Sequence, residues 1–409
     1  MNPIWQPIAI AALAGVAVGL RFTRHWRGYQ FTAWIITAVL AAMIYPAAFL
    51  KWGKLDLNNR WLVLLVVQMV MFGMGTQMRL RDFAGVFRAP RGVLAGTIGH
   101  FTIMPLVGWG LIKVFHLPAE IGAGVILVGA CSSGLASNVM AYLAGANLAL
   151  SVTITAVTTV LAPLATPLWM KLLAGSMIKV NALAMMLNII KIVIVPIGAA
   201  LLHDYLKHAS PRSRKTMRII ALASALWLAV LALGGWPFLT AQVSAGHLQW
   251  ITTANFLLGA LVIGTAYHEL TCVFSRLDRW MPMVSMAGIV YFTVVTTAVG
   301  RDNLLKVGLW LFVVAVLQNT IGYFLGYGLG RATGLDKNSA RSIAFEVALQ
   351  NGGMASGLAA AMGKLGSVGL AAAIFSPWMN VSGSLLANYW RKRPARTPIF
   401  ASTRTQSIT

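Results

Sequence analysis

Charged residues are scarce in this chain, and acidic ones are the scarcest. Only 10% of its 409 residues are Asp, Glu, Lys or Arg, and 9 of these are acidic against 32 basic. The 2 cysteines both lie in apolar runs, so they imply no disulfide framework. The sequence also lacks an HExxH metal motif, a phosphate loop and a nucleophile–base pair, so we expect no enzyme and no cofactor.

Apolar residues are abundant instead. They make up 58% of the chain, whose mean hydropathy is +0.76. Long apolar runs recur, each near the ~20 residues that a spanning helix needs, so we expect an all-α polytopic membrane protein. The expected spans are 4–20, 32–50, 61–78, 92–115, 118–143, 148–173, 180–202, 218–239, 250–272, 282–299, 303–329, 340–361 and 366–390.

Basic residues indicate the orientation of these spans. With the N-terminus outside and the C-terminus in the cytoplasm, the inside loops hold more than twice as many Lys and Arg as the outside loops. We therefore expect a multi-pass protein of the inner (cytoplasmic) membrane. The net charge of +23 is ascribed to topology and anionic lipid, and no nucleic-acid partner is expected.

Two similar stretches indicate an internal repeat. CSSGLASNVMAYLAG (131–145) and FEVALQNGGMASGLAAAMG (345–363) each precede a span with Pro-Leu-Trp-Met or Pro-Trp-Met. Two units of five spans would enter the membrane from opposite sides, as in secondary transporters, although short small-residue strings also recur by chance. The expected parts are an extra N-terminal helix (1–30), a first repeat (31–175), the start of the second (176–203), an inserted helix pair (204–280), the remainder of the second (281–393) and a basic, disordered cytoplasmic tail (394–409).

Glu346 is a carboxylate inside an expected span, with no Lys or Arg within one turn. A charge there is costly, so a bound cation is one explanation and a protonated structural carboxyl is the other. Sodium prefers oxygen ligands, and adjacent glycines allow a helix break that frees carbonyls. The candidate oxygens are those of Gln350, Ser137, Asn138, Ser151 and Thr155, although such hydroxyls also serve simple packing. Lys191, inside another span, is interpreted as a snorkelling lysine, with a substrate contact as the alternative.

Several segments together resemble the bile acid:sodium symporter family. They are MFGMGTQMRLRDF (71–83), LPAEIGAGVILVGACSSG (117–134), GACSSGLASNVMAYLAGANLALSVTITAVTTVLAPLATP (129–167), FEVALQNGGMASGLAAAM (345–362) and FSPWMNVSGSLLANYW (375–390). The resemblance covers about 32–203 and 281–393. It implies two inverted five-helix repeats, a core domain with two broken, crossing helices, and a panel domain that moves against it. About three helices are extra.

The resemblance also implies two sodium sites. The first would use Ser137, Asn138, Ser151, Thr155 and Glu346. The second would use Glu346, Gln350 and the carbonyls near Val347 and Leu349, but His100 stands where family members carry a glutamine. A neutral imidazole is a poor sodium ligand, so either a proton replaces that ion or His100 only forms hydrogen bonds in the core.

The substrate region departs further from the family. Asn351 and Asn380 match amides near the family's substrate crevice, whereas Ser133 and Leu135 replace a frequent glycine and threonine. The predicted function is symport of an organic anion with sodium, with protons as a possible aid. The alternatives are an arsenite-type efflux carrier using Cys131, and a transport-inactive receptor or structural subunit. The oligomeric state stays open.

Overall fold

The computed structural model describes residues 5–22 and 30–393. The expected basic tail (394–409) lies outside the described residues, as do 1–4 and 23–29 at the ends of the expected N-terminal helix. The regular elements of the described chain are helices and one hairpin of two-residue strands, in which Lys51 pairs with Asp56. The protein is an all-α polytopic membrane protein, as predicted.

The elements follow the expected spans closely. In chain order they are α1 (Trp5–Gly19), η1 (Leu20–Phe22), α2 (Gln30–Ile44), α3 (Pro46–Leu50), β1 (Lys51–Trp52), β2 (Leu55–Asp56), α4 (Arg60–Gly75), η3 (Leu80–Ala84), α5 (Gly85–Arg88), α6 (Pro90–Phe115), α7 (Ala119–Ala130), α8 (Leu135–Leu143), α9 (Leu148–Trp169), η4 (Met170–Ala174), α10 (Ala182–Ile189), η5 (Ile190–Ile194), α11 (Val195–His208), α12 (Pro211–Val230), η6 (Leu231–Gly235), α13 (Trp236–Gln242), α14 (Ala245–Val273), α15 (Leu277–Val299), α16 (Arg301–Ala332), α17 (Lys337–Ala348), α18 (Gly352–Ala361) and α19 (Gly369–Arg391).

Not every expected span is one long helix. Within the described residues, 8 helices are long and apolar enough to cross a membrane alone, or 9 if α4 and the bent segment after it count as one span. The other expected spans correspond to the shorter helices α1 and α2 and to two helix pairs, α7 with α8 and α17 with α18. Each pair is broken by a few extended residues, so hydropathy alone detects the run but not the break.

The helices pack in two groups. One consists of α6 to α9 and α16 to α19, which contact each other around the two broken pairs. The other consists of α2, α4, α10, α11 and α15, and it meets the first group mainly through α10 against α9, α4 against α18 and α15 against α19. The first group holds both broken helices, as a core domain would, but the division into core and panel stays a prediction. The inverted relation between the two repeats stays a prediction.

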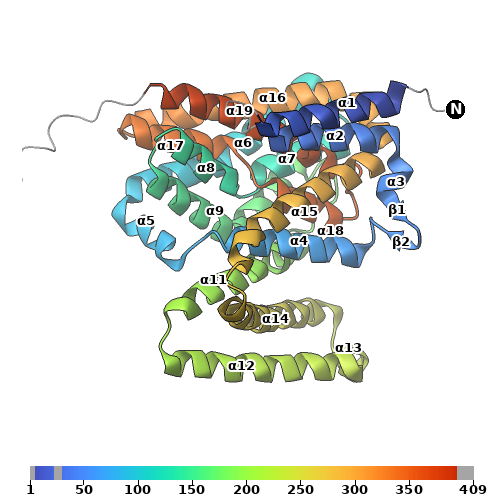
Figure 1. The fold of residues 1–409 in the computed structure, drawn as a ribbon, viewed down its shortest axis with the longest axis vertical. Coiled ribbons are helices and arrows are strands. Elements are labelled where there is room, and N and C mark those ends of the chain that lie inside the picture. The colour runs from blue at the N-terminus through green and yellow to red at the C-terminus, as the bar shows by residue number, and fades with distance from the viewer. Residues whose placement is uncertain (1–4, 23–29, 394–409) are drawn as a thin grey trace, which may run out of the picture.

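The inserted pair lies at the edge of the molecule. Figure 1 shows α12 and α14 as two long helices below the remaining helices, with α14 next to α11. Of the two inserted helices, only α14 packs closely on α11, while α12 packs on α14. Large apolar side chains of α12 are exposed, among them Leu222, Leu226 and Val230, as a lipid-facing helix requires.

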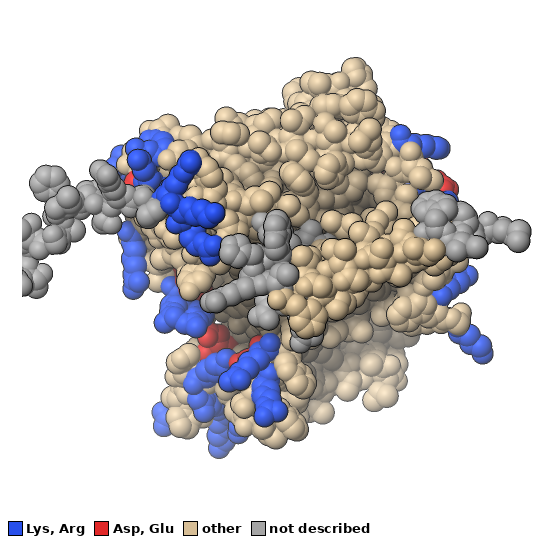
Figure 2. All heavy atoms as spheres, turned by 45° about the horizontal axis from the view of Figure 1, so that its top comes forward, with Lys and Arg blue, Asp and Glu red and all other residues tan. Residues whose placement is uncertain are grey.

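Basic side chains gather at one end of the molecule. Figure 2 shows most of the visible Lys and Arg on the side where α12 begins and α19 ends, with fewer on the opposite side. In the predicted topology the inside loops likewise carry most of the Lys and Arg. Under the positive-inside rule the densely basic end would face the cytoplasm.

Candidate functional site

The two broken helices cross at their extended residues. Chain segments 131–134 and 349–351 separate the halves, and Ser133 pairs with Gln350 in an antiparallel bridge. Gly134 N–H donates to Leu349 O at 3.3 Å, and Asn351 N–H donates to Ser132 O at 2.9 Å. These bonds satisfy backbone groups of buried residues, so the segments can stay extended inside the protein.

Two glycines let backbones approach closely here because they carry no side chain. A Cβ on Gly134 would lie 2.7 Å from the Gln350 carbonyl oxygen of the other extended segment, and one on Gly352 would lie 1.9 Å from Ser376 Oγ of α19. Gly134 therefore permits the crossing, and Gly352 permits the packing of α18 on α19. Asn351 then starts α18, since its side-chain oxygen accepts the Met354 N–H at 3.0 Å. The sequence therefore sets both the break and the restart of the helix locally.

Glu346 lies at the end of α17 and is fully buried. Its carboxylate accepts hydrogen bonds from Ser137 Oγ at 2.6 Å and from Ser151 Oγ, and Thr155 Oγ1 donates to Oε2 at 2.9 Å. Ser137 belongs to α8, whereas Ser151 and Thr155 are one turn apart on α9. The carboxylate thus ties three helices together.

Asn138 and Ser133 complete this oxygen cluster. Asn138 Oδ1 lies 2.9 Å from Ser151 Oγ and 3.2 Å from Thr155 Oγ1. Since each hydroxyl has one proton, it donates either to this amide oxygen or to the Glu346 carboxylate. Ser133 Oγ lies 3.3 Å from both Ser137 Oγ and Leu349 O, and its single proton can be donated to one of them. The structure therefore brings together all five residues of the first predicted sodium site.

The cluster has a net negative charge unless something binds. Within residues 5–22 and 30–393, no Lys, Arg or His side chain is within ion-pair distance of Glu346. Hydroxyl donors alone compensate a buried carboxylate poorly, so a proton or a small cation is required. The oxygens of a carboxylate, an amide and three hydroxyls are suitable ligands for a hard cation such as sodium.

The second predicted site is less complete. Gln350 is fully buried, its Nε2 donates to Val347 O at 2.7 Å, and its Oε1 has no hydrogen-bond partner. Leu349 O is already bonded by Gly134 and Ser133. A rotation of the Gln350 amide would place its oxygen beside the Val347 carbonyl, which is the arrangement a cation needs. Glu346 instead directs both carboxylate oxygens to the first site.

His100 lies between the two broken helices and is fully buried on α6. Its Nδ1 is 2.8 Å from Glu346 O and its Nε2 is 2.7 Å from Cys131 O. Both neighbours are carbonyl oxygens, which only accept hydrogen bonds, and a neutral imidazole has a single N–H. Only the imidazolium form can donate to both.

The predicted substrate residues are less tightly grouped. Asn351 Nδ2 is buried without a hydrogen-bond partner, so it has a donor to offer at the crossing. Asn380 Nδ2 donates to Ser376 O, one turn back in α19. Leu135 starts α8 and is half-buried. Of these predicted substrate residues, Asn351 is the one with a buried hydrogen-bond donor left without a partner.

Sequence reasoning missed several buried polar groups that hold the crossing. Thr158 Oγ1 accepts the Ser133 N–H at 3.3 Å, and Asn319 Nδ2 donates to Ala348 O at 2.9 Å from the neighbouring α16. Asn319 and its neighbour Gln318 are amides inside an expected span, and polar residues there could have indicated a buried polar contact. Its partner is a backbone carbonyl of a distant segment, so spacing could not reveal the contact.

Two broken helices that cross inside a helical membrane protein, with a buried carboxylate among hydroxyls, define the class of ion-coupled membrane transporters. The model of the Sodium Bile acid symporter family matches residues 64–242. The "Uncharacterized sodium-dependent transporter YocS" of Bacillus subtilis is 34% identical over 378 residues, which are 91% of this chain and 94% of that protein. The "Probable sodium/metabolite cotransporter BASS1, chloroplastic" of Arabidopsis thaliana is 26% identical over 88% of this chain and 73% of its own.

The chain therefore belongs to the sodium bile acid symporter family, a family of sodium-dependent transporters. Among solved structures, the sodium proton antiporter MjNhaP1 from Methanocaldococcus jannaschii has a similar fold, with a TM-score of 0.55 over 96% of this chain and 99% of that one. The sequence identity is only 11%, so this likeness concerns the fold alone.

Proposed function

We propose that the protein is a secondary active transporter that carries an organic anion together with sodium across the cytoplasmic membrane. The observation that supports this best is the environment of Glu346, a fully buried carboxylate surrounded by hydroxyl and amide oxygens from α8 and α9. Sodium bound there would have Ser137, Asn138, Ser151, Thr155 and Glu346 as ligands.

Sodium would couple to the substrate through the crossing. An ion bound between Glu346 and the hydroxyls holds α17 against α8 and α9, and therefore keeps both extended segments in register. Helices α8 and α18 both begin at the crossing, where their N-terminal dipoles favour an anion. Asn351, Asn380, Ser133 and Leu135 would line that place, so the two ligands bind with positive coupling.

A proton would take the role of a second sodium. The second ion would use Glu346, Gln350 and the carbonyls of Val347 and Leu349, but His100 occupies the place beside it. As an imidazolium, His100 donates to a carbonyl of each broken helix and supplies a positive charge at the crossing. Transport would then be driven by sodium and assisted by protons.

Alternate access would come from movement of the α4, α11 and α15 group against the group that holds the crossing. The densely basic end would face the cytoplasm, with the C-terminus inside and the N-terminus outside. An arsenite-type exporter would depend on the thiol of Cys131. This thiol is buried, and the Cys131 carbonyl contacts His100 Nε2. A small buried thiol is typical of a residue that only fills apolar space, so we favour import over thiol-dependent export.

Uptake into proteoliposomes tests the proposal. Radiolabelled cholate and pyruvate serve as a sterol acid and a small keto acid, with a sodium gradient compared with a potassium gradient of equal size. Uptake of at least one probe should require sodium and should be lost in Glu346→Gln. The control is Glu269→Gln, since Glu269 is an exposed partner of Arg218 far from the crossing in the fold.

Sodium-driven accumulation that persists in Glu346→Gln would contradict the site. Transport in the opposite direction would favour the exporter, and no transport of any organic anion would favour a receptor or structural subunit.

A further inference from the structure

A cavity of about 560 Å³ lies apart from the crossing, between the two helix groups. Its walls come from the first turns of α4, from α10 and η5, from α14, and from the end of α18 with the loop that follows it. Residues Asn58 and Gly363 at its rim belong to connections at the less basic end of the molecule. Under the proposed topology, the cavity opens to the outside.

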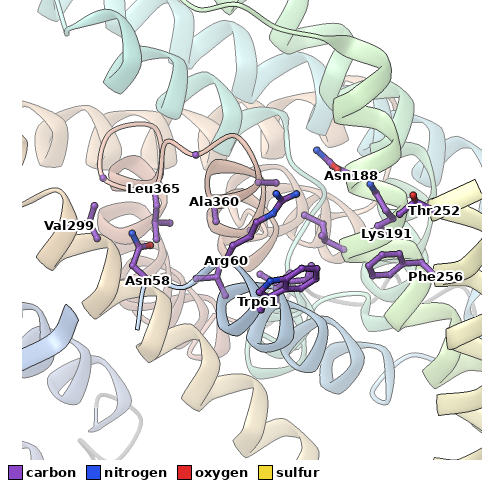
Figure 3. A pocket seen from close by; sticks show the side chains of 18 residues that line it. Asn58, Arg60, Trp61, Asn188, Lys191, Thr252, Phe256, Val299, Ala360 and Leu365 are labelled. Carbon is purple, nitrogen blue, oxygen red and sulfur yellow. The ribbon is translucent and has the colours of Figure 1, made fainter. Parts of the chain in front are cut away.

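Two cations face this cavity, and no acid does. Figure 3 shows Arg60 reaching into it from α4 and Lys191 facing it from the opposite wall, with Asn188 beside Lys191. No Asp or Glu lines the cavity, and no ion pair of either cation occurs among the described residues.

Lys191 is held in place by an irregular turn. It lies in η5, a π-helical segment inside an otherwise α-helical span, and such segments occur frequently at functional sites. The turn presents its carbonyl to Gln68 of α4, whose Nε2 donates to it at 2.7 Å. This hydrogen bond holds the backbone of the turn against α4, so the Lys191 side chain starts at the wall of the cavity that it lines.

The rest of the lining suits an apolar body. Trp61 and Phe256 supply aromatic rings, and Thr252 and Phe256 come from the inserted helix α14. The volume is within the range of ~300–1,000 Å³ of small-molecule sites. At the floor, a Cβ on Gly357 would meet Val67 at 3.0 Å, so tight packing separates the cavity from the crossing.

We propose that this cavity is an outer vestibule in which an organic anion first binds, with Arg60 and Lys191 holding its carboxylate or sulfonate and the aromatic side chains contacting its apolar part. The proposal rests on the proposed function, since it concerns the anion that the crossing would then receive. It gives the inserted helices a role, because α14 forms one wall. Lys191 is then a substrate contact and not a snorkelling lysine.

Thiol chemistry tests the vestibule without sodium. In the full-length Cys272→Ser protein, which leaves only the buried Cys131, Thr252→Cys places one thiol in the cavity wall. Its rates with anionic sulfonatoethyl and cationic trimethylammonioethyl methanethiosulfonate are each divided by the rate with a free thiol in solution. Focusing by two cations should favour the anionic reagent by about tenfold or more, and salt should reduce the preference.

The variants Arg60→Gln and Lys191→Gln should each lower this ratio, and the double variant should bring it near one. Lys179→Gln is the matched control, since Lys179 is an exposed cation before α10 that does not line the cavity, and it should leave the ratio unchanged. Cholate in potassium buffer should slow the reaction in the parent only. A thiol that reacts with neither reagent, or a ratio that the double variant does not change, would overturn the proposal.

The outcome for the vestibule is separable from that for transport. A charge-dependent ratio without any sodium-driven uptake would leave the vestibule in place and reject the symport. Normal uptake with an unchanged KM in Arg60→Gln and Lys191→Gln would keep the symport and reject the vestibule.

Discussion

Gly134→Ala is the smallest change that tests the crossing. The φ of Gly134 is −97°, which any L-residue adopts, so its backbone alone does not require glycine. The constraint is space, because the new methyl group would lie 2.7 Å from the Gln350 carbonyl oxygen. To reach an ordinary contact of about 3.4 Å, the two extended segments must separate by roughly 0.7 Å.

The cost follows from the bonds between these segments. Gly134 N–H already donates to Leu349 O at 3.3 Å, so the separation breaks this hydrogen bond. Overpacking costs about 1–3 kcal/mol, and a lost buried hydrogen bond adds about 1 kcal/mol. Since Ser133 on the displaced segment contacts the sodium ligand Ser137, with 3.3 Å between the two hydroxyl oxygens, sodium binding at the neighbouring cluster should weaken as well.

The assay is thermal unfolding of purified protein in sodium and in potassium. Gly134→Ala should melt several degrees lower and should show a smaller stabilisation by sodium. Gly110→Ala is the matched control, because Gly110 lies in α6 with nothing within 4 Å of a new Cβ. Alanine there should be neutral or stabilising by up to about 1 kcal/mol. If both variants behave alike in melting and in sodium response, the account of the crossing is refuted.

Two further predictions concern the cluster and its neighbour. Ser137→Ala removes a donor to the Glu346 carboxylate worth about 1.5–3 kcal/mol and should weaken sodium binding by roughly tenfold or more in a titration. Thr159→Ala is the control, because the Thr159 hydroxyl donates to the Thr155 carbonyl and not to Glu346, and it should leave sodium binding unchanged. Equal weakening by Ser137→Ala and Thr159→Ala would show that the hydroxyls act through packing. His100→Gln replaces a proton carrier by an oxygen ligand, so the difference in sodium response between pH 6 and pH 8 should shrink and a second sodium should bind. An unchanged pH difference would exclude His100 as the proton site.

The fold was largely predictable because its signals are local. Apolar runs near 20 residues located the helices, and the strings around Gly134 and Gly352 marked the breaks, since Gly allows close backbone approach. Glu346 and the paired hydroxyls Ser151 and Thr155 could be predicted as a cluster because a carboxylate inside a span needs partners.

The remaining features depend on backbone groups of distant segments. The two carbonyls on His100 belong to residues 131 and 346, and neither carbonyl has a sequence signature. Lys191 and Arg60 lie 131 positions apart, and only packing of η5 against α4 brings them to one cavity. The role of α14 as a cavity wall could not be predicted either. Hydropathy distinguishes a membrane span from a loop, but it does not distinguish a helix that lines a cavity from one that faces lipid.

The central claim is that Glu346 binds sodium, and one measurement tests it most directly. The melting temperature of purified protein is recorded while sodium replaces potassium at constant ionic strength, for the parent, Glu346→Gln and Glu269→Gln. A ligand that binds only the folded state must raise the apparent stability. We expect a sodium-specific rise in the parent and in Glu269→Gln that is lost in Glu346→Gln. No sodium-specific rise in the parent, or an equal rise in all three proteins, would contradict the account.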